Sequence, residues 1–198
     1  MQMFGEDDEI EIGGDRANGS SLRARPYLMA HDSLGTVGYV LEANGVRLGF
    51  ATDLGRVTEG LLGHLADVDA LAIESNYDRS MQELSDRPVF LKRRIMGGAG
   101  HLSNEESLEA VLELARDVEL THVVPLHLSQ QCNRPELITR MYAERAADLL
   151  DRLTVTNQHR ATPLLEVVRA RRREESRPSL SPGNGRAAVR AGHQHMMF

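Results

Sequence analysis

The sequence predicts an α/β (α+β) fold with an aliphatic core. The pair Asn44-Gly45, set between two apolar runs, indicates a β-hairpin. Beyond residue 56, short apolar runs alternate with stretches of helical period, which is typical of α/β proteins. The chain has 198 residues, of which 41% are hydrophobic, so it is long enough for one domain with a real core. Because only 4% are aromatic and tryptophan is absent, that core must be built mainly from aliphatic side chains.

The hairpin is the best-specified local structure. A two-residue Asn44-Gly45 turn of type I′ sets Ala43 opposite Val46, and this pairing fixes the register of the two strands. One face of the hairpin then carries large apolar side chains, and the other carries small residues that allow close packing. The large side chains are Tyr39, Leu41, Leu48 and Phe50, and the small residues include Gly38 and Gly49.

The next elements follow from periodicity and end signals. Residues 57–65 have helical spacing, and residues 70–73 form a short apolar strand that ends at Glu74. Ser103 and Glu106 match a capping box, and they precede an apolar helix face over residues 108–115. Residues 121–126 read as a buried strand that delivers His127 to its carboxyl end. Pro135 opens a helix that runs to about residue 153, and residues 164–168 form a last strand.

Charge divides the chain into two regions, 1–168 and 169–198. The second region has seven arginines and two glutamates among Ser, Pro and Gly, without periodicity, and it is expected to be a disordered Arg-rich tail. With a net charge of −6 for the whole chain, the first region is strongly acidic, which argues against a broad nucleic-acid footprint but leaves room for a local basic patch. A single cysteine and the lack of any long apolar run predict a soluble cytoplasmic protein without a membrane span.

Six short motifs occur in one order along the chain, and together they resemble the metallo-β-lactamase fold. They are His31-Asp32 with Thr36-Val37-Gly38-Tyr39, Ala51-Thr52-Asp53-Leu54-Gly55, Glu74-Ser75-Asn76, Gly100-His101-Leu102-Ser103-Asn104, Leu126-His127-Leu128-Ser129, and Asn133. The similarity covers about residues 8–153 and is greatest to the WalJ/YycJ-type branch of nuclease-like and phosphodiesterase-like hydrolases, which is related to ribonuclease Z. The resemblance implies the αββα sandwich of that family.

The resemblance also implies roles for individual residues. His31 is similar to the third histidine of the first metal site, Asp53 to the carboxylate that bridges both metals, and His127 to the closing histidine of the second site. His101 resembles the histidine that assists the leaving group as a general acid. Such enzymes hold two ions, Zn²⁺ or Mn²⁺ here, which activate water and clamp a phosphodiester.

The sequence departs from the family pattern at one place. No His-x-His-x-Asp-His stretch occurs in the 198 residues, so the chain is expected to correspond to the C-terminal half of the fold. Two ligands per metal would make weak sites, and the chain alone is expected to be nearly inactive unless another chain supplies the first motif. One sheet face would then lack its partner, which predicts self-association.

Other residues have plainer interpretations. Glu74 and Asn76 are expected to orient loops, and Arg93 and Arg94, beside Lys92, either meet substrate phosphates or form a solvated helix face. Three histidines are expected to be structural or superficial, namely His64, His122 and His159. His193-Gln194-His195 lies in the tail and does not replace the missing motif.

Two functions stay open at this point. The first is a metal-dependent hydrolase of nucleic acid or of a small phosphodiester. The second is a non-catalytic remnant or interaction protein that keeps half of the fold.

Overall fold

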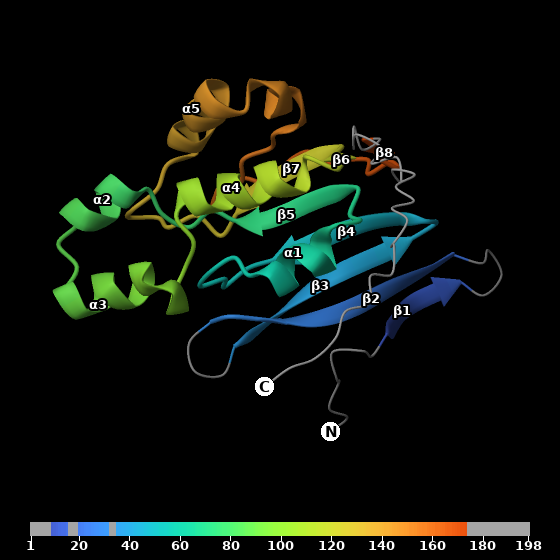
Figure 1. Cartoon of the computed structure of the whole chain (residues 1–198), viewed down its shortest axis with the longest axis horizontal. Coiled ribbons are helices and arrows are strands. Elements are labelled where there is room, and N and C mark those ends of the chain that lie inside the picture. The colour runs from blue at the N-terminus through green and yellow to red at the C-terminus, as the bar shows by residue number, and fades with distance from the viewer. Residues whose placement is uncertain (1–8, 16–19, 32–34, 174–198) are drawn as a thin grey trace, which may run out of the picture.

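The computed structural model describes residues 9–15, 20–31 and 35–173, and it is organised around one six-stranded sheet (Figure 1). The strand order is β1-β2-β3-β4-β5-β7, with bounds β1 Ile10–Asp15, β2 Ser20–Met29, β3 Thr36–Ala43, β4 Val46–Ala51, β5 Ala70–Glu74 and β7 His122–Leu126. Strands β1 to β4 pair antiparallel, whereas β4, β5 and β7 run parallel. The mixed α/β character predicted from the sequence is confirmed.

The β3–β4 hairpin has the predicted register. Ala43 pairs with Val46, and the ladder continues to Tyr39 opposite Phe50. Asn44 and Gly45 have φ values of 53° and 74°, as a type I′ turn requires. The turn chemistry therefore determines the pairing, as expected.

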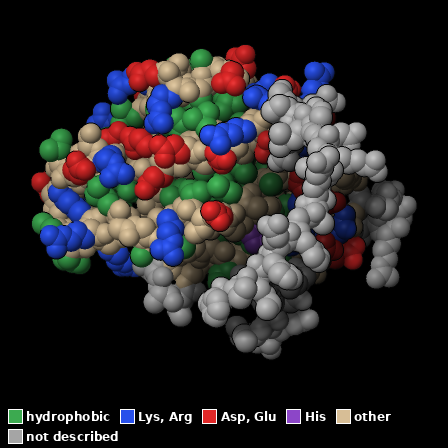
Figure 2. Space-filling model, in the orientation of Figure 1, with side chains coloured by type: hydrophobic (Ala, Val, Ile, Leu, Met, Phe, Trp, Pro, Cys, Tyr) green, Lys and Arg blue, Asp and Glu red, His purple; other side chains and the backbone are tan. Residues whose placement is uncertain are grey.

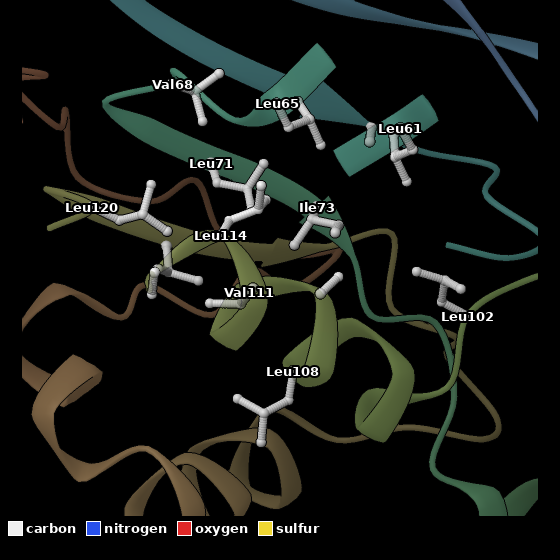
Figure 3. Packing of buried hydrophobic residues seen from close by; sticks show 14 of the residues in the cluster. Leu61, Leu65, Val68, Leu71, Ile73, Leu102, Leu108, Val111, Leu114 and Leu120 are labelled. Carbon is white, nitrogen blue, oxygen red and sulfur yellow. The ribbon is translucent and has the colours of Figure 1, made fainter. Parts of the chain in front are cut away.

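Helices α1 (Glu59–Leu65) and α4 (Asn104–Leu114) lie on one face of the sheet (Figure 1). Thr58 caps α1, and the predicted capping box of Ser103 and Glu106 opens α4. Leucines and valines from α1, β5 and α4 point toward one another and form the main core (Figure 3). The small residues of the hairpin permit this packing, since a Cβ on Gly49 would lie only 2.6 Å from Leu65 Cδ2.

Three short elements lie between β5 and α4, and of these only a helix face at Arg93 and Arg94 was among the alternatives drawn from the sequence. They are α2 (Arg79–Leu84), α3 (Val89–Arg94) and a π-helical turn (Ile95–Ala99). A second apolar cluster anchors them, with Tyr77, Ile95 and Cys132 at its centre and Met81, Leu91 and Met96 around it. They stand beyond the carboxyl ends of β5 and β7, at the left of Figure 1.

The helix predicted from Pro135 to about residue 153 is shorter than expected. Helix α5 spans Pro135–Arg145, and a 3₁₀ helix spans Ala147–Arg152. Between them Ala146 leaves the helical region, with φ −150° and ψ 48°. This break turns the chain so that Ala146 and Leu149 are both buried, and burial therefore overrides the continuous helical pattern.

The C-terminal part of the described chain also differs from expectation. The strand predicted over residues 164–168 does not form, and instead β8 (Arg171–Arg172) pairs antiparallel with β6 (Val118–Glu119). The buried carboxylate of Asp69 accepts hydrogen bonds from the backbone N–H groups of Arg47 at 2.7 Å and Ala170 at 2.9 Å. The expected disorder therefore does not extend to residues 169–173, because a buried acceptor fixes that segment. Residues 174–198 lie outside the described residues.

The second face of the sheet is partly open. Leu28 and Val37 are 58% and 44% exposed there, and a hollow of about 440 Å³ lies between residues that include Leu22, Leu41 and Leu48. The described residues form this six-stranded sheet and the β6–β8 ladder, so the second large sheet of the expected αββα sandwich is not among them. None of the helices in the described ranges is long and apolar enough to cross a membrane.

Candidate metal centre

The sheet topology brings the carboxyl ends of three parallel strands to one edge. Asp53 follows β4 by two residues, Glu74 is the last residue of β5, and His127 follows β7 directly. Ligands commonly bind at this edge of α/β sheets because the loops that leave it converge. His31, two residues after β2, and His101, just before α4, approach from either side.

Asp53 and His127 face each other at the centre of this edge. His127 Nε2 lies 3.7 Å from Asp53 Oδ1. Both residues have left-handed backbones, with φ values of 55° and 59°, which is uncommon for residues other than glycine. Asn76 holds one of these backbones, since its side-chain amide donates a 2.8 Å hydrogen bond to the carbonyl oxygen of His127. Backbone strain of this kind is typical of functional sites.

Glu74 is the centre of the hydrogen-bond network. Its side chain is fully buried, and its Oε1 accepts hydrogen bonds from His101 Nδ1 at 2.8 Å and from the Leu102 N–H at 3.2 Å. Its Oε2 accepts from the Leu54 N–H at 2.9 Å and lies 3.4 Å from His127 Nδ1. One carboxylate therefore holds both histidine rings and the two loops that carry Asp53 and His101.

These contacts shift the ionisation of the groups involved. Burial raises the pKa of the Glu74 carboxyl, but the hydrogen bonds from His101, His127 and the Leu54 N–H outweigh burial and bring that pKa below its ordinary value. The hydrogen bond to Glu74 raises the pKa of His127 above its ordinary value; desolvation opposes that rise, and the charges of Glu74 and Asp53 add to it. Glu74 is therefore an anion at neutral pH, and its charge attracts the proton on the imidazole of His127.

The three site histidines form a row. The ring centroids of His31 and His101 are 5.3 Å apart, and those of His101 and His127 are also 5.3 Å apart. His31 Nδ1 lies 2.8 Å from the carbonyl oxygen of Gly100, which can only accept, so in this pair Nδ1 carries the hydrogen. The lone pair of neutral His31 is then on Nε2. Ligand histidines in metal sites commonly have their second nitrogen held by a carbonyl or carboxylate in this way.

The donor set fits a divalent cation. Asp53, Glu74, His101 and His127 each offer one ligand atom, and these four atoms all lie within 4.8 Å of one another. Imidazole nitrogen together with carboxylate oxygen suits first-row ions such as Zn²⁺ and Mn²⁺. Because both Glu74 oxygens already accept hydrogen bonds from the backbone, Glu74 is better suited to orient the histidines than to bind an ion.

The four site residues named from the sequence are thus near one another. Asp53, His101 and His127 belong to the cluster, and His31 lies beside it. His31, Asp53 and His101 line one open cavity of about 470 Å³, together with Arg87, Arg94 and Gln131 among others. The plainer interpretation of the other histidines agrees with their contacts: His64 stacks on Tyr27, His122 bonds the Glu166 carbonyl, and His159 is exposed.

The expectation that Glu74 orients loops agrees with its hydrogen bonds to the Leu54 and Leu102 N–H groups, but its contacts with two histidines were not predicted, and Arg87 was not singled out. The signal for the contacts of Glu74 was an acidic residue that ends a wholly apolar strand, since such a carboxylate is buried and needs partners. Arg87 gave no such signal. Its guanidinium is held by Gln82, which is 5 positions away, and by Ser129 and Gln131, which are 42 and 44 positions away, so no local pattern marks the set.

Comparison with known proteins supports the family suggested by the motifs. A profile of the beta-lactamase superfamily domain matches residues 2–128. The exodeoxyribonuclease YycJ of Bacillus anthracis is 30% identical over 124 residues, which are 63% of this chain and 47% of that protein. The exodeoxyribonuclease WalJ of Streptococcus pneumoniae strain D39 is 29% identical over 164 residues, which are 80% of this chain and 60% of that protein.

The fold has a solved counterpart. The crystal structure of Zn²⁺-bound PqqB from Methylobacterium extorquens matches with a TM-score of 0.51 and 23% identity, over 82% of this chain and 52% of that one. The present chain spans about half to three fifths of the length of the relatives that it matches. The profile match, the nuclease relatives and the shared fold agree, and the chain belongs to the beta-lactamase superfamily, with the metallo-β-lactamase fold.

Proposed function

We propose that this chain contributes part of the active site of a metal-dependent hydrolase that cleaves phosphodiester bonds. The observation that carries the proposal is the convergence of Asp53, His101 and His127 around the buried Glu74 carboxylate. The matched relatives are exodeoxyribonucleases, which supports a nucleic acid as the substrate class. A small phosphodiester would present the same bond to the same residues.

Different pairs of residues of the chain would bind each of two metal ions. Asp53 and His127 would hold one ion, and Asp53 with His31 would contribute to a second. A bound divalent ion would supply Lewis acidity toward the phosphoryl oxygens and lower the pKa of a water ligand. Glu74 keeps the His127 ring turned so that Nε2 is directed toward Asp53.

His101 is suited to carry a proton to the leaving group. Its Nδ1 is fixed by Glu74 at 2.8 Å, so its Nε2 is the nitrogen that remains for a substrate in the cavity. Imidazole changes its charge near neutral pH, which lets one side chain both hold a proton and release it. The contact with Glu74 also fixes the orientation of the His101 ring before a substrate arrives.

Full activity requires more ligands than this chain offers. The residues counted from the family resemblance give two ligands to each metal, whereas catalytic zinc sites have about three protein ligands. We therefore propose that the chain alone is nearly inactive, and that a polypeptide with a His-x-His-x-Asp-His motif completes the site.

Two measurements test the proposal. Calorimetry of the isolated chain should show weak zinc or manganese binding that Asp53→Ala abolishes, while Asp148→Ala, on an exposed carboxylate, binds as wild type. Adding a polypeptide that carries the family's first motif should restore metal-dependent hydrolysis of bis-p-nitrophenyl phosphate. Tight binding of two ions by the chain alone would refute the count of two ligands per metal. If no mixture with a polypeptide that carries the first motif hydrolyses the substrate, the proposed hydrolase function is refuted.

A second candidate is a non-catalytic interaction protein. The exposed side chains of Leu28 and Val37 on the open sheet face favour it, because such surfaces commonly bind partners. This candidate predicts stable association with a partner and no hydrolysis under any metal condition.

A further inference from the structure

The segment that contains α2 and α3 has an unusual surface. Leu84, Val89 and Phe90 are 85%, 64% and 74% exposed, and they lie within seven consecutive positions. They are three of the eight large apolar side chains that are exposed among the described residues. We call residues 79–94 the α2–α3 arm. Figure 2 shows apolar and basic side chains side by side at the end of the molecule where Figure 1 places this arm.

The arm is basic although the chain is acidic. It carries five cationic side chains and two acidic ones, whereas the whole chain has a net charge of −6. The acidic pair is Glu83 and Asp86. Lys92 Nζ donates a 2.7 Å hydrogen bond to the Glu83 carbonyl and ties α3 to α2. The net positive charge of the arm favours an anionic partner.

The arm leads directly into the candidate metal centre. Arg87, Leu91 and Arg94 line the 470 Å³ cavity, which His31, Asp53 and His101 also line. Phe90 is four residues before Arg94, so the two side chains share one helix face about 6 Å apart along the axis. An anionic ligand in contact with Phe90 could therefore place a negatively charged group near Arg94, at the cavity.

Arg87 is held in place for such a ligand. Its guanidinium donates to Gln82 Oε1 at 3.2 Å, to Gln131 Oε1 at 3.2 Å and to Ser129 Oγ at 3.4 Å. Gln82 is itself fully buried, and the apolar cluster around Tyr77, Ile95 and Cys132 fixes the base of the arm. The cation thus reaches the cavity from a rigid support, which reduces the entropy lost when an anion binds.

We propose that the α2–α3 arm binds a single-stranded nucleic acid and guides it to the metal centre. An exposed aromatic ring beside arginines is the combination that such strands require, because bases stack on the ring and phosphates meet the cations. Paired bases in a duplex are already stacked, so the exposed ring favours a single strand. The guidance of the nucleic acid to the metal centre rests on the proposed function. Binding of the nucleic acid to the arm requires neither a bound metal nor turnover.

Fluorescence anisotropy with a labelled oligothymidylate tests the proposal, with EDTA present so that nothing is cleaved. Phe90→Ala should weaken binding by roughly 5- to 150-fold, the equivalent of about 1–3 kcal/mol for a stacked base. Phe90→Tyr should retain binding because it keeps the ring, and Leu164→Ala, on a fully exposed leucine outside the arm, should bind as wild type. Phe90 and Leu164 are both largely exposed, so the three variants should stay folded by circular dichroism.

Salt dependence tests the electrostatic part. Arg93→Ala should reduce the slope of log K against log salt by about 0.7, the value for one phosphate contact with a single strand. Arg140→Ala, an exposed arginine on α5, is the matched control and should leave the slope unchanged.

Several outcomes would overturn the inference. Wild-type protein that does not bind the oligonucleotide at low salt would refute it, as would Phe90→Ala and Arg93→Ala variants that bind like wild type. If the Phe90→Ala change alters sedimentation but not oligonucleotide binding, the arm is an interface between copies of the chain. If the chain binds the oligonucleotide but Asp53 binds no metal, only the proposed hydrolase function is refuted. If metal-dependent hydrolysis occurs without oligonucleotide binding, only nucleic-acid binding by the α2–α3 arm is refuted.

Discussion

Single side chains at the candidate metal centre are held by partners that come from distant parts of the chain. His31 is fixed by the Gly100 carbonyl, and His101 and His127 by Glu74, so each of the three imidazoles has one nitrogen engaged by an oxygen. Such contacts set the orientation of a ring before a ligand arrives. Substitution of His101 or Glu74 should therefore change one measurable property, the rate of turnover for His101 and the pH dependence of stability for Glu74.

His101 should affect turnover more than binding. In the enzyme completed by a polypeptide with the first metal motif, His101→Ala should slow hydrolysis of bis-p-nitrophenyl phosphate by roughly 10²- to 10⁴-fold, the usual contribution of a general acid. Metal content should be measured in parallel, because His101 lies near the ligand atoms. An unchanged rate at full metal content would assign His101 a structural role.

Glu74 should govern how the stability of the metal-free protein varies with pH. Its pKa is lowered from 4.5, so its contribution is present above that value and is lost as pH falls through the lowered pKa. The pKa of His127 is raised from 6.5, so its contribution is present below that value and is lost as pH rises through the raised pKa. Both contributions are complete between about pH 4.5 and 6.5.

The variant Glu74→Gln should flatten this pH dependence in urea unfolding. Its amide group cannot accept from both the Leu54 and Leu102 N–H groups, so one buried N–H loses its partner at a cost of about 1–3 kcal/mol. Glu113→Gln, on an exposed carboxylate, is the matched control. A Glu74→Gln protein with the wild-type pH profile would contradict the assignment.

At the scale of elements, the hairpin and the parallel strands have separate tasks. The β3–β4 hairpin presents small residues to the core, and the parallel strands β4, β5 and β7 end where Asp53, Glu74 and His127 converge. Helices α1 and α4 cover the face on which Gly38 and Gly49 lie, and the α2–α3 arm extends past the site. Close packing on the hairpin therefore supports the edge that carries the site.

Gly38→Ala should be destabilising because the added Cβ would lie 2.5 Å from Tyr27 Cζ. Tyr27 is buried and its hydroxyl donates to the Phe50 carbonyl at 3.1 Å, so the ring cannot move without losing that bond. We expect a loss of about 1–3 kcal/mol in urea unfolding. Gly63→Ala makes the same change in α1, where the Cβ meets nothing within 4 Å, and should stabilise by about 0.5–1 kcal/mol. Equal effects at the two positions would show that packing on the hairpin is loose.

At the scale of the whole molecule, the two faces of the sheet are unequal. One is covered by α1 and α4 and contains the main core, and the other exposes Leu28, Val37 and Ile12 and also has a hollow of about 440 Å³ lined by Leu22, Leu41 and Leu48 among others. Exposed apolar area is unfavourable by about 25 cal/mol per Å², so covering these exposed side chains would lower the free energy of the protein.

The purified chain should therefore self-associate, as sedimentation velocity or light scattering would show. Removal of residues 174–198 should not prevent this, since those residues are largely polar. The double substitution Leu28→Glu and Val37→Glu should shift the protein toward monomer, whereas Leu164→Glu, outside the sheet, should not. A stable wild-type monomer at tens of micromolar would contradict this expectation.

The sequence by itself determined the features that depend on neighbours along the chain. The Asn44-Gly45 turn set the hairpin register, Ser103 and Glu106 set the start of α4, and the motif order led to the family. Turn geometry, capping and strand alternation act over a few residues, so local chemistry is sufficient for them.

Only the tertiary structure decided which side chains share a buried environment. It placed Glu74 between His101 and His127, tied Ala170 to Asp69, and broke the last helix at Ala146. These outcomes depend on the burial of a charge or an apolar group against residues that are 20 to 101 positions away. The free energy of that burial depends on the assembled surroundings, which no local pattern in the sequence records.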